Sequence, residues 1–234
     1  MDTPKYEILS DGHIRALRHV NPGVDVGDIG GMVGGYRNLA HDGECWIGPN
    51  AGVLERAVVQ NDAQVFGHAT VTGNARVRAD ARVGEHVVLD DHVIVEGRAV
   101  VIGDVSASGW SQITGDAKVS GLTNIGDRVI IDGNAEVSGW NYFRGDVRIG
   151  STAFVHNLGD VSCDAAIYQS DHAMQNAVPD LVMVRLRGGT EWVYGDMFEG
   201  TLDDLVKEIP DGCERYYGPL LKFIEQARER VASW

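Results

Sequence analysis

Three residues whose side chains could perform chemistry stand eighteen positions apart in this chain: His68, His86 and Asp104. If residues at that spacing lie above one another, two imidazoles and a carboxylate form a column. Such a column could bind a metal ion, orient a general base or hold an anion. Arg82 lies four residues before His86 and could supply positive charge to an anionic ligand. The structural alternative is a polar corner that simply faces solvent.

The element that must position these residues is a six-residue repeat that runs from Cys45 to Leu158. Nineteen units follow one another without insertion or deletion. The third position is Val, Ile or Leu in seventeen units, with Ala107 and Phe143 as the exceptions. The first position is Ala in ten units, and the fifth is Gly in ten and Asn or Asp in four. A fixed short period of this kind indicates a solenoid.

Positions one and three of each unit point to the same side of a strand, so each unit offers two apolar residues to one core. The fifth residue tolerates the positive φ of a turn. The pattern therefore predicts an all-β parallel β-helix with three hexads per turn. Crossover rules favour a right-handed coil. The small-x-aliphatic-x-Gly unit resembles that of hexapeptide acyltransferases, whose coil is left-handed, and we predict a left-handed coil here.

The segments on either side of the repeat predict three divisions of the chain. Residues 1–44 should cap the first coil, because an open coil end exposes unpaired strand edges. Residues 45–158 form the β-helix, and residues 159–234 should form a small α+β module. In that module "LVMVRL" and "TEWVYGDMF" predict a hairpin, and Thr201 with Asp204 predicts a capped short helix that ends before Pro210. Gly218-Pro219 should open a second helix.

Several segments resemble one family of hexapeptide-repeat proteins. "IRALR", "GDIGGMV" and "NLAHDGECWIG" lead directly into the hexads, as in the amino-terminal signature of the YdcK-like family. "MFEGTLDDL" resembles a later stretch of that family, with Met197 in place of its cysteine. Members are bacterial and phage proteins that are labelled acetyltransferases. The resemblance implies a homotrimer that uses acetyl-CoA or another acyl-CoA. We interpret "GDIGGMV" itself as structural, because it lacks the lysine of a phosphate-binding loop.

Hexapeptide acyltransferases resemble one another in using a histidine base in the cleft between subunits. On that resemblance the catalytic candidates are His68, His86 and His156, and the ligand-binding candidates are Arg82 and Asp104. His92, between Asn74 and Trp110 on the next corner, is a weaker candidate. The chain lacks the family's local histidine motif and any loop that interrupts the hexads. A non-enzymatic trimeric scaffold that binds a small anionic ligand therefore stays open as a second function, and so does the question whether the chain is an enzyme.

Two other groups of coil proteins share features with this sequence. "FRGDVRIG" resembles a stretch of γ-carbonic anhydrase, whose zinc needs three histidine ligands. Only His156 and His172 follow it, so we predict no zinc and no other metal. Cys45, Cys163 and Cys213 lack metal-ligand spacing, and Cys45 falls at an inward core position. Bactofilin-like polymerisation is disfavoured by the capped ends.

The composition and charge of the chain indicate which binding partners and which cellular compartment to expect. The net charge of −14 disfavours nucleic acid and anionic membranes as partners. The chain has no apolar signal core after Met1 and no run of eighteen apolar residues, so we expect a cytoplasmic protein. A small-molecule ligand or substrate is the expected partner.

One outward strip of the coil is apolar, and exposed apolar strips usually mark interfaces. Its residues are Phe66, Val100, Ile102 and Phe154, with Leu122, Trp140 and Leu158 along the edge. A closed ring of subunits buries the same apolar face of every subunit and leaves no unpaired copy of that face exposed. We therefore predict a parallel homotrimer with ligand clefts between adjacent coils.

Overall fold

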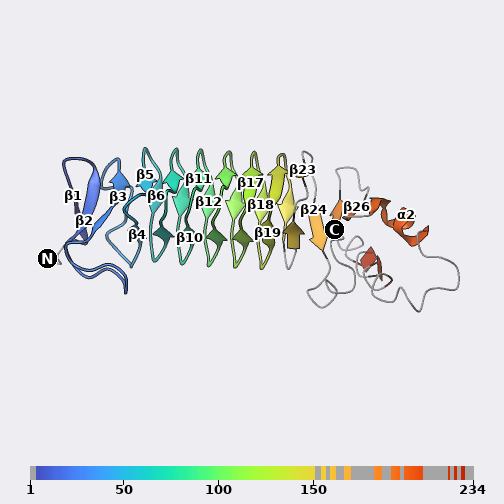
Figure 1. The fold of residues 1–234 in the computed structure, drawn as a ribbon, viewed down its shortest axis with the longest axis horizontal. Coiled ribbons are helices and arrows are strands. Elements are labelled where there is room, and N and C mark those ends of the chain that lie inside the picture. Colours follow the sequence, from blue (N-terminus) through green and yellow to red (C-terminus); the bar gives the residue numbers. More distant parts are fainter. Residues whose placement is uncertain are drawn as a thin grey trace.

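The chain forms a parallel β-solenoid in which short strands stack along one long axis (Figure 1). The computed structural model describes residues 4–150, 154–156, 159–161, 166–169, 182–185, 191–195, 198–207, 221, 224–225 and 228–229. Within these residues the strands form three sheets of 10, 7 and 10 strands. The prediction of an all-β parallel β-helix is therefore confirmed.

We name the three sheets by their order along the chain. Face 1 contains β1 (Tyr6–Ile8), β2 (His13–Ala16), β3 (Ile29–Val33), β5 (Gly52–Val53), β8 (Thr70–Val71), β11 (Val88–Leu89), β14 (Ser106–Ala107), β17 (Leu122–Ile125), β20 (Trp140–Phe143) and β23 (Gly159–Val161). Face 2 contains β4 (Trp46–Ile47), β7 (Gln64–Val65), β10 (Arg82–Val83), β13 (Val100–Val101), β16 (Lys118–Val119), β19 (Glu136–Ser138) and β22 (Phe154–His156). Face 3 contains β6 (Val58–Val59), β9 (Arg76–Val77), β12 (Ile94–Val95), β15 (Gln112–Ile113), β18 (Ile130–Ile131), β21 (Arg148–Ile149), β24 (Ala166–Gln169), β25 (Val182–Arg185), β26 (Glu191–Gly195) and β27 (Phe198–Thr201).

The hexad period fixes both the pairing and the core. In face 2, β10 pairs in parallel with β7 and β13, so that Val83 lies opposite Val65 and Val101. All three valines are buried in one stack, as the third position of the hexad predicted. The two exceptions to the pattern, Ala107 and Phe143, are buried as well. The core is therefore a column of small and branched side chains that runs the length of the coil.

Three inward positions carry polar side chains, and each finds a partner inside the coil. Ser111, Thr123 and Asn141 are buried at first positions. The hydroxyl of Thr123 donates to the carbonyl of Ser120 at 3.0 Å. The amide of Asn141 donates to the carbonyl of Ser138 at 2.7 Å and to the Thr123 hydroxyl at 3.2 Å. These bonds offset the cost of burying polar groups.

Left-handed backbone closes each corner of the coil. Every fifth position of the hexads from Glu55 to Gly145 has positive φ, whether the residue is glycine or not. At the corner between faces 1 and 3, acidic residues alternate with glycines. There the carboxylates of Glu55, Asp91 and Asp127 accept the backbone N–H of Gly73, Gly109 and Gly145, at 3.1, 3.0 and 2.9 Å. Each of these acidic side chains thus ties its own turn to the following one, at every second junction along this corner.

The amino-terminal segment, which we predicted to cap the coil, continues face 1. β1 and β2 pair antiparallel, β2 and β3 pair antiparallel, and β3 joins β5 in parallel. Lys5 is buried beneath this cap, and its ammonium donates to the carbonyl and to Sγ of Cys45, each at 3.1 Å. Burial raises the pKa of the Cys45 thiol despite the opposing effect of Lys5. Cys45 is therefore a core residue, as its hexad position indicated.

Parallel stacking continues through β22, the strand of the last hexad, and then beyond the hexads through β23 and β24. β25, β26 and β27 then add to face 3 as antiparallel strands. The predicted hairpin is confirmed by the β25–β26 pairing, in which Val182 lies opposite Tyr194. Pro210 and Gly218-Pro219, which were expected to end one helix and open another, lie outside the described residues. No helix in the described part of the chain has the length and apolar character needed to cross a bilayer.

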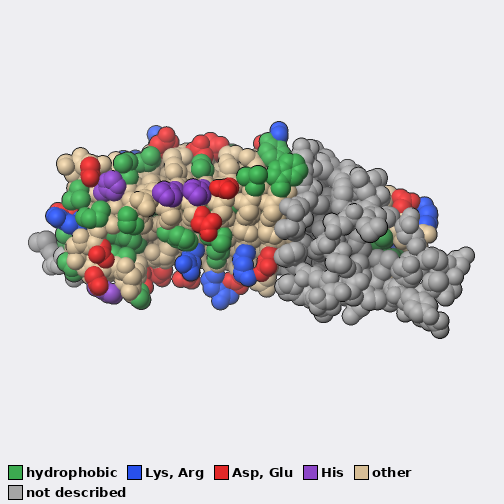
Figure 2. All heavy atoms as spheres, viewed as in Figure 1, with side chains coloured by type: hydrophobic (Ala, Val, Ile, Leu, Met, Phe, Trp, Pro, Cys, Tyr) green, Lys and Arg blue, Asp and Glu red, His purple; other side chains and the backbone are tan. Residues whose placement is uncertain are grey.

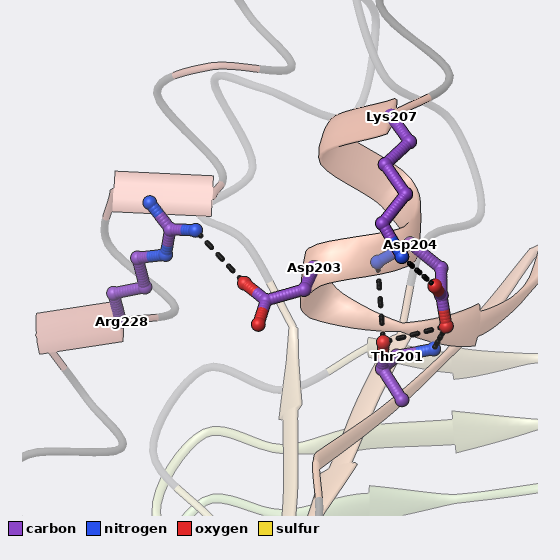
Figure 3. A network of polar contacts seen from close by, with 5 residues as sticks. All are labelled: Thr201, Asp203, Asp204, Lys207 and Arg228. Atoms are coloured by element: carbon purple, nitrogen blue, oxygen red, sulfur yellow. Dashed lines mark hydrogen bonds and ion pairs between the residues drawn. The ribbon is translucent and has the colours of Figure 1, made fainter.

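The predicted cap of the short helix is also confirmed. Helix α2 (Leu202–Lys207) begins after Thr201, whose hydroxyl accepts the backbone N–H of Asp204 at 3.1 Å (Figure 3). The Asp204 carboxylate in turn accepts the backbone N–H of Thr201 at 3.2 Å, which is the reciprocal pattern of a capping box. Lys207 and then Thr201 lower the pKa of Asp204 to about 2.

Candidate functional site

The corner between faces 2 and 1, which we name the histidine corner, brings His68, His86 and Asp104 together. The rings of His68 and His86 stack with centroids 5.5 Å apart and planes 4° from parallel. Nδ1 of His86 lies 3.4 Å from Oδ1 of Asp104. On the face of the molecule seen in Figure 2, histidine side chains lie in line along the coil. The predicted column therefore exists.

The coil backbone sets the spacing of this column. The backbone N–H groups of His68, His86 and Asp104 donate to carbonyls one turn further on, at 2.7, 3.1 and 2.9 Å. Each side chain thus starts from a backbone position fixed by the adjacent turn. Such a rigid scaffold holds catalytic groups more accurately than a free loop does.

The chemistry open to the column follows from the His86–Asp104 pair. A carboxylate that accepts a hydrogen bond from Nδ1 of an imidazole favours the tautomer whose Nε2 carries the lone pair. The side chains of His86 and Asp104 are 67% and 68% exposed. A single chain therefore supplies a possible base and its orienting group, but no wall that would exclude water from them.

Arg82 does not join this column. Its guanidinium carbon lies 5.5 Å from the centre of the Phe66 ring, within cation–π distance, on face 2. The Phe66 ring in turn lies against Gly84, where a Cβ would come within 2.1 Å of the ring. The structure gives Arg82 an aromatic partner, and any part it takes in ligand binding stays a prediction.

The other two histidine candidates lie elsewhere. His156 ends β22, where its backbone pairs with Ser138, and its side chain lies outside what the structure describes. His92 stacks on Trp110 at the corner between faces 1 and 3, with ring centroids 3.9 Å apart and planes 9° from parallel. We name this second corner the tryptophan corner.

The structure bears on the prediction of no bound metal only through the described residues. Among the described residues, no group of three or more His, Cys, Asp or Glu side chains is arranged to hold a metal ion. Cys163, Cys213 and His172 lie outside those residues. The expectation of no metal is therefore still to be tested.

Sequence reasoning missed a cleft of about 430 Å³ beside the tryptophan corner. It is lined by Trp110, Gln112, Arg128, Ile130, Asp146, Val147 and Arg148. The available signal was the eighteen-residue spacing of Trp110, Arg128 and Asp146, which places them in one column. The lining combines this column with the neighbouring column of Gln112, Ile130 and Arg148 on face 3, so neither column alone indicates the cleft.

The sequence matched no protein-family model and no curated protein.

Proposed function

We propose that this chain is a trimeric hexapeptide-repeat acyltransferase of the YdcK-like kind that takes its acyl group from an acyl-CoA. The observation that carries the proposal is the His86–Asp104 pair on a corner of a rigid coil. In the proposed reaction, Nε2 of His86 accepts the proton of an acceptor amine or hydroxyl as that group attacks the thioester carbonyl. The carbon–sulfur bond breaks, and the thiolate of coenzyme A takes up the proton. Asp104 stabilises the transient imidazolium.

A neighbouring subunit would supply the missing wall of this site. The histidine corner continues along the coil into Leu122 and Trp140, which are 56% and 57% exposed. Hydrophobic side chains also gather on this side of the coil in Figure 2. Burying a side chain of this size contributes about 1.5–3 kcal/mol, so a partner that covers both would be held firmly. Phe66, Val100 and Ile102 are already half-buried within one chain, so they add less to such an interface.

We expect light scattering of the purified chain at micromolar concentration to return about three times the chain mass. Replacing both Leu122 and Trp140 with glutamate should dissociate the trimer, because the charges would have to be desolvated at the interface. Val26→Glu is the control, since Val26 is equally apolar and 68% exposed but lies in the amino-terminal cap. A monomeric unmodified chain would contradict the trimer and remove the intersubunit cleft with it.

Catalysis is tested by calorimetric titration with acetyl-CoA and by release of the coenzyme A thiol in the presence of a panel of amines and sugars. We expect His86→Ala to lower turnover by about 10²–10⁴-fold, the usual contribution of a general base. His19→Ala is a matched control, because His19 forms an exposed pair with Asp25 at 2.9 Å in the cap. Undiminished activity in the His68→Ala, His86→Ala double variant would remove the column and leave His156 as the candidate base.

A non-enzymatic trimer that binds a small anion is the second candidate. The parallel stacking of His68 and His86 favours it, because two imidazoles one turn apart offer adjacent N–H donors to a single anion. Binding of acetyl-CoA without thiol release, lost in the double histidine variant, would support this function over transfer. Either function fits the cytoplasm, which we propose as the compartment.

A further inference from the structure

We propose that the cleft beside the tryptophan corner binds an acidic sugar, a carbohydrate with one carboxylate and several hydroxyls. The site goes beyond the proposed function, because the tryptophan corner and the histidine corner lie on opposite edges of face 1. Its volume of about 430 Å³ falls within the range of small-ligand sites.

Trp110 gives the cleft a flat apolar wall. Its side chain is 62% exposed, yet its indole is backed by the imidazole of His92 at a centroid distance of 3.9 Å. The stacked pair limits the freedom of the indole before any ligand arrives, which reduces the entropy lost on binding. The face of an indole carries partial negative charge, and the C–H bonds on one side of a sugar ring present partial positive charge to it.

Two guanidiniums give the cleft its donors. Nη2 of Arg128 pairs with Asp146, and Nη2 of Arg148 pairs with Asp132 at 2.6 Å. Each guanidinium has five N–H groups, and each of these ion pairs uses the hydrogens of one terminal nitrogen. The remaining N–H groups can donate to a ligand carboxylate, the geometry in which arginine binds most specifically. The ion pairs meanwhile restrain both side chains beside the cleft.

The hydrogen-bond acceptors of the cleft and its net charge indicate the class of ligand. The amide of Gln112 and the carboxylate of Asp146 line the same cleft and can bind sugar hydroxyls. Two guanidiniums face two carboxylates, so the site is close to neutral, and the whole chain carries −14. A nucleotide polyphosphate brings several charges, whereas the N–H groups left on two paired guanidiniums match a single carboxylate. One negative charge with many hydroxyls is the better match.

The test is a titration of the full chain with the monosaccharides D-galacturonic acid and N-acetylneuraminic acid, each of which has one carboxylate, and each is compared with its methyl ester. Binding is followed by calorimetry and by tryptophan fluorescence. We expect at least one acid to bind, its methyl ester to bind at least tenfold more weakly, and ADP to bind more weakly than the acid. Trp110→Ala and Arg148→Met should each weaken binding at least tenfold, with the circular dichroism spectrum unchanged.

Two matched variants serve as controls. Arg98→Met removes a guanidinium that pairs with Asp116, eighteen residues on, at a different corner, and Tyr36→Ala removes an exposed aromatic ring from the cap. Both should bind as the unmodified chain does. The proposal is overturned if neither acid binds, if the methyl esters bind equally well, if ADP binds more tightly, or if Trp110→Ala and Arg148→Met bind normally.

Discussion

Replacing Val101 with aspartate is expected to prevent the chain from folding. Val101 is fully buried and pairs in parallel with Val83 on one side and Val119 on the other. A carboxylate at this point has aliphatic neighbours in the turns before and after it and no partner for its charge. The effective penalty for such a charge is several kcal/mol, against a total stability of about 5–15 kcal/mol for a typical domain.

The adjacent residue provides the control. Val100 belongs to the same strand, β13, but its side chain points outward and is only half-buried. Val100→Asp should therefore fold, and its circular dichroism spectrum should match that of the unmodified chain. Soluble, cooperatively unfolding Val101→Asp protein would contradict the inward assignment of third positions.

The second large effect is expected at Gly31, in the "GDIGGMV" segment. A Cβ on Gly31 would lie 2.2 Å from the carbonyl oxygen of Ala51 and 2.5 Å from that of Gly48. Both are backbone atoms of the first coil, so no side chain can move aside to make room. Overpacking commonly costs about 1–3 kcal/mol, and a clash with backbone should cost at least that much. Gly31→Ala should therefore lower the midpoint of thermal unfolding by several degrees, at about 2–4 °C per kcal/mol for a chain of this size.

Gly52→Ala is the matched control for this prediction. Gly52 lies on β5, directly opposite Met32 of β3, and a Cβ there meets nothing within 4 Å. Its midpoint should stay the same or rise slightly, because alanine restricts the unfolded chain. Equal midpoints for the two variants would mean that β3 does not pack against the first coil as closely as the structure has it.

The parts of the fold that could be predicted from the sequence are those that the six-residue period determines. The six-residue unit recurs often enough that irregular members such as Ala107 and Phe143 are assigned correctly from their neighbours. Their burial follows from register alone. The capping box at Thr201 and Asp204 was equally accessible, because its residue types and spacing are local. The handedness of the coil stays a prediction.

Only those features of the candidate sites that depend on strand register could be predicted from the sequence. Register placed His68, His86 and Asp104 in one column, but it gave no measure of how open that corner is. It also could not show that Arg82 lies over Phe66, because that contact depends on side-chain rotamers. The burial of Lys5 beside Cys45 joins residues forty positions apart across an aperiodic cap, where no repeat helps.

Because of the pairing register, the number of a residue also gives its position along the coil axis and the face on which it lies. Paired strands differ by eighteen, as Arg82 and Val100 do, so each step of eighteen moves a residue one strand spacing, about 4.8 Å, along the axis. Gain or loss of an eighteen-residue block would lengthen or shorten the rod and leave every longitudinal column continuous. A six-residue block would preserve the inward pattern equally well, yet it would shift all later residues onto the next face. The histidine corner would then lose its continuation into Leu122 and Trp140. Insertions and deletions in such a rod therefore preserve the inward pattern in multiples of six residues. They preserve the surface columns only in multiples of eighteen.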